Sequence, residues 1–120
     1  FYPGTGAAEE TGHGNIVNVP LRAGAGSAEF RAAWTERILP ALDAFAPQIV
    51  LISAGFDAHA ADPLAATNLN EDDYRYITAK IAAIARSHAR GRIVSTLEGG
   101  YDLDALANCA GAHVAALMAA

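Results

Sequence analysis

The sequence has 120 residues, of which 52% are hydrophobic and 18% charged, and its net charge is -5. That length suits one small domain with its own core and is too short for two. The composition excludes a disordered chain and a membrane-spanning segment, and the scattered basic residues argue against a nucleic-acid surface.

Cys109 is the only cysteine, so the chain can form neither an internal disulfide nor a zinc site built from cysteines. A reducing, cytoplasmic compartment fits this usage best. The first residue is Phe1 rather than Met, and we expect the natural N-terminus to lie upstream.

The N-terminal segment is expected to be irregular. Residues 1–15 contain Gly and Pro at a density that is typical of loops. Residues 16–21 could form a short strand, which Pro20 would confine to an edge or an end.

A first helix is expected to run from Ser27, as its N-cap, to about Phe45. Pro40 interrupts this span and predicts a kink or an early stop near Leu39. The apolar residues that mark one helical face are Phe30, Trp34, Ile38 and Leu42, and we expect Trp34 to anchor the core.

The middle of the chain predicts a buried strand and then a helix. Residues 48–54 form an apolar run without polar alternation, which is typical of a strand covered on both faces in a parallel sheet. After a loop over residues 56–69, Asn70 can cap a second helix with acidic side chains in its first turn. The inner face of this helix is marked by Tyr74, Ile77, Ile81 and Ile84.

The C-terminal part again predicts a strand followed by a helix. Residues 92–97 predict the next strand, and Asp102 or Asp104 can open a last helix with apolar residues on one side, namely Leu106, Ala110, Val114 and Leu117. Strands that alternate with helices are typical of βαβ units in a right-handed parallel sheet. Three strands leave edges and faces without cover, so we expect the chain to be part of a larger α/β domain.

Candidate site residues follow two of the predicted strands. Functional sites gather at the carboxyl ends of strands in an open parallel sheet. Asp57 follows one strand, and Tyr101 follows two glycines after the next. A carboxylate that binds a metal beside a phenol that donates to an oxyanion would suit metal-assisted hydrolysis. Other interpretations stay open: Asp57 could cap a turn, Tyr101 could pack on a helix, and His59 could pair with Asp57 on a metal or lie exposed in the loop.

Five blocks of sequence resemble the histone deacetylase family in residues, order and spacing. The GFD and EGGY versions look most like the class II branch and its bacterial relatives, which include acetylpolyamine amidohydrolases. The blocks are FYPGTG (1–6), NVPL (18–21), SAGFDAH (53–59), DPL (62–64) and LEGGY (97–101), and they span nearly the whole chain.

The resemblance implies a fold and an activity. The fold would be an α/β sandwich of arginase/deacetylase type, a parallel sheet between two helical layers, with residues 1–120 as the C-terminal portion of one catalytic domain. The activity would be hydrolysis of an N-acetyl amide on lysine or a polyamine-like amine, with Zn²⁺ or Fe²⁺ as cofactor. By position, Asp57 matches a metal ligand and Tyr101 the phenol that hydrogen-bonds the substrate carbonyl, while the tunnel walls match Tyr2, Gly99 and Gly100.

The family pattern is incomplete in these 120 residues. Its Asp-x-His pair of metal ligands and its tandem catalytic histidines lie upstream of the PGTG block, and His59 matches no ligand. His13, His88 and His113 do not replace them, and we expect these three to be loop, helix-surface or packing residues. The isolated chain is therefore expected to be inactive. Substrate identity, native metal and oligomeric state are left open.

Two alternatives remain. A nucleotide-binding α/β domain is suggested by the GAGSAE segment at residues 24–29, although Glu29 would place an anion where a pyrophosphate binds. The other alternative is a deacetylase-like protein without catalysis, either a binding module or a decayed remnant. The presence of both Asp57 and Tyr101 argues against decay within this segment, and an upstream Asp-x-His pair with adjacent histidines would favour the enzyme.

Overall fold

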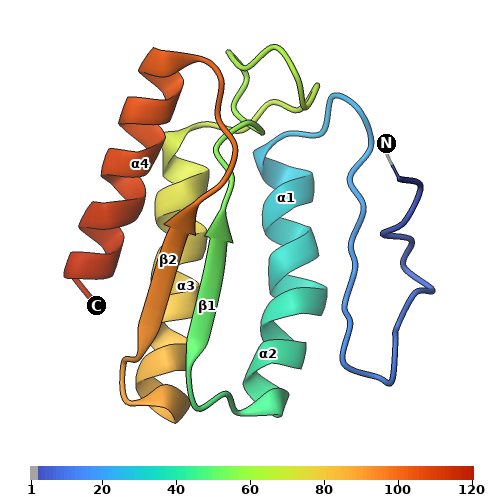
Figure 1. Cartoon of the computed structure of the whole chain (residues 1–120), viewed down its shortest axis with the longest axis vertical. Helices are drawn as coiled ribbons and strands as arrows, with labels where there is room; N and C mark the ends of the chain where they lie inside the picture. Colours follow the sequence, from blue (N-terminus) through green and yellow to red (C-terminus); the bar gives the residue numbers. More distant parts are fainter. Residues whose placement is uncertain (1–2) are drawn as a thin grey trace.

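The computed structural model describes residues 3–120 and contains helices packed on a small parallel sheet (Figure 1). Tyr2, the expected tunnel residue, lies outside the described residues. In Figure 1 α3 runs behind the two strands, with α4 on one side and the α1–α2 helix on the other. The elements in chain order are α1 (Ser27–Ala33), the π-helical segment η1 (Trp34–Ile38), α2 (Leu39–Phe45), β1 (Val50–Ala54), α3 (Glu71–Ala89), β2 (Ile93–Leu97) and α4 (Leu103–Met118). None of these helices is long and apolar enough to cross a membrane.

The sheet consists of β1 and β2, which pair in parallel with Val50 opposite Ile93 and Ala54 opposite Leu97. Helix α3 makes the crossover between them, so the expected βαβ unit is confirmed for this part of the chain. The strand expected over residues 16–21 is wrong, because this segment has no strand partner among the described residues and stays irregular. Pro20 also lacks the N–H that a ladder requires.

The two faces of the sheet differ in burial. Val50 and Ala54 are each only 8% exposed and point into the core formed with α3. On the opposite face the paired residues Leu51 and Val94 are 72% and 56% exposed. The expectation that β1 is covered on both faces is therefore wrong for residues 3–120, in which no helix covers the second face (Figure 1).

The first helix continues through Pro40 to Phe45, so the early stop expected near Leu39 is wrong. The turns just before the proline widen into the π-helical segment η1, where the Leu39 N–H donates to the carbonyl of Trp34. A wider turn relieves the clash between a proline ring and the preceding carbonyl, and it needs no hydrogen bond from the proline. Trp34 is half-buried against the core cluster rather than fully enclosed.

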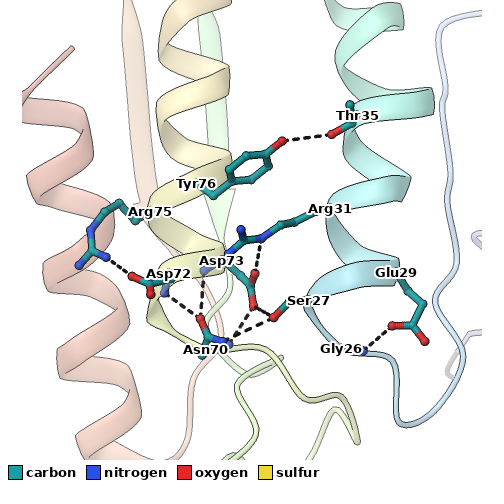
Figure 2. A network of polar contacts seen from close by, with 10 residues as sticks. All are labelled: Gly26, Ser27, Glu29, Arg31, Thr35, Asn70, Asp72, Asp73, Arg75 and Tyr76. Carbon is teal, nitrogen blue, oxygen red and sulfur yellow. Dashed lines mark hydrogen bonds and ion pairs between the residues drawn. The ribbon is translucent and has the colours of Figure 1, made fainter.

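The junction between α1 and α3 is held by polar side chains around Asp73 (Figure 2). Asp73 is 0% exposed and accepts hydrogen bonds from Ser27 Oγ at 2.6 Å and Arg31 Nε at 2.7 Å. Ser27 was expected to be the N-cap of α1, but that position is taken by Gly26. The Ser27 hydroxyl instead ties α1 to α3.

Helices α3 and α4 begin at the expected caps. Asn70 accepts from the N–H groups of Asp72 and Asp73, and Asp102 accepts from the N–H of Ala105 at 2.8 Å. The apolar side expected for α4 is wrong in part, because Val114 is 50% exposed. The buried face lies on neighbouring positions and, apart from one histidine, carries small side chains. It consists of Ala105, Cys109, Ala112, His113 and Ala116. Cys109 is a core residue, as expected.

Candidate active site at the carboxyl edge of the sheet

The segments that follow β1 and β2 run side by side past the ends of the strands. The Phe56 N–H donates to the carbonyl of Gly99 at 2.7 Å, and the Glu98 N–H donates to the carbonyl of Ala54 at 3.0 Å. These bonds continue the strand pairing into the two loops. The structure therefore brings together the two loops that carry Asp57 and Tyr101, as the topology predicts.

The Asp57 carboxylate lies directly over two glycines. A Cβ atom at Gly99 would come within 2.8 Å of Oδ2 and 2.9 Å of Cγ, and one at Gly55 would lie 3.1 Å from Oδ1. Both loops must present a bare backbone for this side chain to fit, so the glycines serve a close approach. Asp57 is half-buried, and among residues 3–120 its carboxylate accepts no hydrogen bond and forms no ion pair. A carboxylate in that state can accept an external partner.

Tyr101 follows Gly100, a position at which the backbone and its surroundings accept only glycine. Gly100 has a φ of 138°, and a Cβ there would come within 3.0 Å of Leu106 Cδ1 and 3.3 Å of Phe56 Cβ. The backbone then enters α4 after its N-cap, Asp102, while Tyr101 stays 58% exposed. Its phenol has no hydrogen-bond partner in the described part of the chain, which leaves the hydroxyl able to donate to a ligand.

Sequence reasoning missed the role of Asp62. Asp62 is 8% exposed, and its carboxylate reaches across to the Tyr101 loop, where Oδ2 accepts from the N–H of Tyr101 at 2.7 Å and of Asp102 at 3.3 Å. Oδ1 accepts from the N–H of Leu64 at 3.0 Å. Burial disfavours the charged form, but the main-chain donors of Tyr101, Leu64 and Asp102 outweigh it and lower the pKa of Asp62. The signal in the sequence was the Asp-Pro pair, which favours a turn closed by the aspartate side chain.

His59 does not pair with Asp57. Its Nδ1 accepts from the N–H of Ala61 at 3.1 Å, and its Nε2 lies 3.6 Å from the carboxylate of Glu71. The side chain is 15% exposed, so the expectation of an exposed loop residue is wrong. Asp57 and Ala58 form a turn and His59 makes only an isolated bridge to Leu69, so the continuous strand that would align the Asp57 and His59 side chains is missing.

The other histidines also lie away from Asp57. His13 is exposed in the N-terminal loop, and His88 pairs with Asp43 on the surface at 2.8 Å. His113 is buried in α4 between the hydroxyls of Thr78 at 2.7 Å and Ser95 at 2.9 Å, and burial lowers its pKa. These placements match the expected loop, surface and packing roles. Within residues 3–120 no three His, Cys, Asp or Glu side chains form a group that could hold a metal ion. Asp57 therefore fits a metal as a single ligand only.

The α1 N-terminus does not suit a pyrophosphate. Glu29 accepts from the N–H of Gly26 at 3.1 Å and pairs with Arg22, so a carboxylate already occupies the position that a phosphate would need. No strand precedes this segment in the described residues. A helix does open after the glycines, but the preceding strand and a free anion position, which the dinucleotide fingerprint also requires, are both missing.

Comparison with known proteins gives a consistent result. The family pattern described as "Histone deacetylase domain" matches residues 1–117. The chain is 43% identical over 128 residues to type-2 histone deacetylase 2 of Dictyostelium discoideum, covering 98% of this chain and 8% of that protein. It is 43% identical over 105 residues to a histone deacetylase-like amidohydrolase of Pseudomonas aeruginosa, covering 84% of this chain and 28% of that protein.

Solved structures agree with these sequence matches. The HDA15 HD domain superposes with a TM-score of 0.90 at 37% identity, over 99% of this chain and 34% of that one. The histone deacetylase Clr3 superposes with a TM-score of 0.86 at 34% identity, over 99% of this chain and 20% of that one. The chain thus spans about a third or less of each of these four proteins.

Proposed function

The chain belongs to the histone deacetylase family and has a partial α/β fold of arginase/deacetylase type, and from that premise we propose that it is the C-terminal part of a catalytic domain that hydrolyses N-acetyl amides. The observation that carries the proposal is the meeting of the Asp57 and Tyr101 loops at one edge of the sheet. The uncovered apolar face of the sheet supports the idea that further elements of the same domain pack there.

Asp57 is proposed as one ligand of a catalytic Zn²⁺ or Fe²⁺. The support is a half-buried carboxylate without a partner in residues 3–120, held against bare backbone at Gly55 and Gly99. A bound metal of this kind supplies an activated water and polarises a carbonyl. Because one carboxylate is too few, the Asp-x-His pair must come from outside this chain, and the isolated chain is proposed to be inactive.

Tyr101 is proposed to donate a hydrogen bond to the substrate carbonyl as negative charge develops on its oxygen. Its exposed phenol and the tight Gly99–Gly100 approach support this role. Gly99 and Gly100, with Tyr2, are proposed to line the channel for the acyl chain. The substrate class is an acetylated lysine or a polyamine-like amine, supported by relatives that are named histone deacetylases and an amidohydrolase.

The test compares two proteins and one substitution. The full-length gene product is expected to deacetylate an acetyl-lysine peptide or an N-acetylated diamine, whereas purified residues 1–120 show no turnover above background. Tyr101→Phe is expected to lower kcat of the full-length product by about 10²–10³. Tyr76→Phe is the matched control, because within the described chain the Tyr76 hydroxyl hydrogen-bonds just to Thr35, at the surface.

Full activity of Tyr101→Phe would contradict the role of the phenol. If residues 1–120 alone turn over the substrate and Tyr101→Phe abolishes this turnover, the proposal that the isolated chain is inactive is wrong. A coding region that lacks an upstream Asp-x-His pair and tandem histidines would favour the binding module over the enzyme.

A further inference from the structure

Tyr101 is held in place by its backbone rather than by its side chain. Tyr101 is 58% exposed, and its phenol has no hydrogen-bond partner in the described residues. The Tyr101 N–H, in contrast, donates to Asp62 Oδ2 at 2.7 Å, and the next N–H along the chain donates to the same oxygen at 3.3 Å. Asp62 lies 39 residues away in the sequence, so this contact joins the two loops of the site.

We propose that Asp62 is a positioning residue, which holds the backbone of Tyr101 and thereby aims its phenol. This inference rests on the proposed function of Tyr101. It adds a residue that neither binds the metal nor touches the substrate.

The local sequence explains why Asp62 can reach the loop. Oδ1 accepts from the N–H of Leu64, two residues on, and closes a turn around Pro63. The proline fixes its own φ, so the turn is rigid. One oxygen is thus used to orient the carboxylate, and the other is left for the Tyr101 loop.

The receiving loop needs an outside acceptor. Gly100 has a positive φ of 138°, and immediately after it the N–H groups of Tyr101 and Asp102 precede the first turn of α4. Among the described residues these two donors have no acceptor other than Asp62. The Asp102 side chain is already used to cap Ala105. A carboxylate beside a helix N-terminus is also favoured by the helix dipole.

A purely stabilising role is the competing explanation, and a double substitution separates the two. Asp62→Asn keeps the size of the side chain and removes its charge. In the full-length gene product it is expected to lower kcat about 10- to 100-fold with KM changed less than about threefold, because the substrate-binding groups stay in place. In the Tyr101→Phe background the same substitution is expected to change kcat less than about twofold, since the hydroxyl that Asp62 positions is gone. Equal losses in both backgrounds would overturn the proposal.

Amide exchange gives a readout that does not depend on activity. A peptide covering residues 98–104 is expected to exchange about tenfold faster in Asp62→Asn than in wild type. Asp73→Asn is the matched control, because it removes a buried carboxylate from the α1–α3 junction and should speed exchange there instead. Unchanged exchange over residues 98–104 in Asp62→Asn would overturn the proposal.

A third variant, Asp62→Glu, and the activity of Tyr101→Phe separate failure of the positioning role from failure of the proposed function. Asp62→Glu retains the charge but moves the oxygens by one methylene, so it is expected to fold even where Asp62→Asn does not and still to lower kcat and speed exchange over residues 98–104. If Tyr101→Phe has full activity, the proposed function fails, and the exchange experiment alone decides whether Asp62 holds the loop. If Tyr101→Phe is inactive and Asp62 variants match wild type in both measurements, only the positioning role fails.

Discussion

The α1–α3 junction and the strand-end loops are each built around a buried aspartate, but they satisfy it differently. At the junction, Asp73 meets a guanidinium and a hydroxyl from another helix (Figure 2). In the loops, the donors that Asp62 meets within the described part of the chain are all main-chain N–H groups. Beside it, Asp57 accepts nothing from residues 3–120.

The difference separates stability from function. The oxygens of Asp73 are already bound by an opposite charge and further donors, and removal of one partner from such a buried pair is strongly destabilising. A carboxylate held only by packing against glycine backbone keeps its oxygens available. The α1–α3 junction thus holds a carboxylate with several partners, whereas the edge of the sheet holds Asp57, a carboxylate without a partner in residues 3–120.

Asp73→Ala tests the junction and should give the largest effect on stability. Removal of the carboxylate leaves Ser27 and the half-exposed Arg31 without their acceptor, and we expect the free energy of unfolding to fall by about 2–4 kcal/mol. Urea denaturation measures this change. Asp72→Ala, which removes an exposed carboxylate paired with Arg75, should cost several-fold less. Equal costs would remove the distinction between the two regions.

Gly99→Ala tests the strand-end loops. The added methyl would lie 2.8 Å from an Asp57 oxygen, so the carboxylate must move away. We expect kcat of the full-length gene product to fall about 10- to 100-fold and its bound metal, measured by elemental analysis, to decrease. Gly111→Ala on α4, where a new Cβ meets nothing within 4 Å, is the control and should keep both values. Retained metal and activity in Gly99→Ala would show that the position of Asp57 is not critical.

The buried His113, which packs between α3 and the sheet, makes the stability of the fold depend on pH. Burial lowers its pKa below the ordinary 6.5, so the folded state binds this proton less readily than the unfolded chain. The contribution of neutral His113 to the free energy of unfolding is therefore complete above about pH 6.5. It is lost as the pH falls from 6.5 towards the lower pKa of the folded state, by up to about 1.4 kcal/mol per pH unit.

Urea denaturation at pH 7.5 and pH 5.5 measures this loss, with His113→Gln as the comparison. We expect the variant to be less stable at pH 7.5, since Thr78 and Ser95 lose their partner, and to lose less stability on acidification. A variant with the same pH dependence as wild type would assign the effect to other groups.

Tyr74→Phe should give the smallest effect. The Tyr74 hydroxyl is buried and has no hydrogen-bond partner among residues 3–120, and burial raises the pKa of Tyr74, so the hydroxyl stays neutral. Its removal is expected to leave the free energy of unfolding unchanged or raise it by up to about 1 kcal/mol. Thr78→Val, which removes a buried hydroxyl bonded to His113, should lower it by about 1–2 kcal/mol. A large loss in Tyr74→Phe would reveal a partner for this hydroxyl.

Particular residues show how far the sequence predicted the molecule. Asn70 and Asp102 cap their helices as expected, because a cap depends on a few consecutive residues. Ser27 does not cap α1, because its hydroxyl donates to Asp73 on α3, which lies 46 residues further along the chain. The segment over residues 16–21 has strand-like composition, but a strand requires a partner that the described chain does not provide.

The candidate site shows the same division. The motifs around Asp57 and Tyr101 predicted which two loops meet, because parallel strands end at one edge of a sheet. The support that Asp62 gives to Tyr101 and the engagement of His59 with Glu71 were not predictable, since both depend on how a loop returns across the sheet end.

The sequence by itself determined the βαβ order, two helix caps, the family and the pair of loops that carry the candidate chemistry. These follow from local hydrophobic patterns and short motifs, which act over a few residues. Only the tertiary structure decided which carboxylate is neutralised, which supports a neighbouring loop and which is left free. That outcome depends on donors that the fold brings from distant parts of the chain.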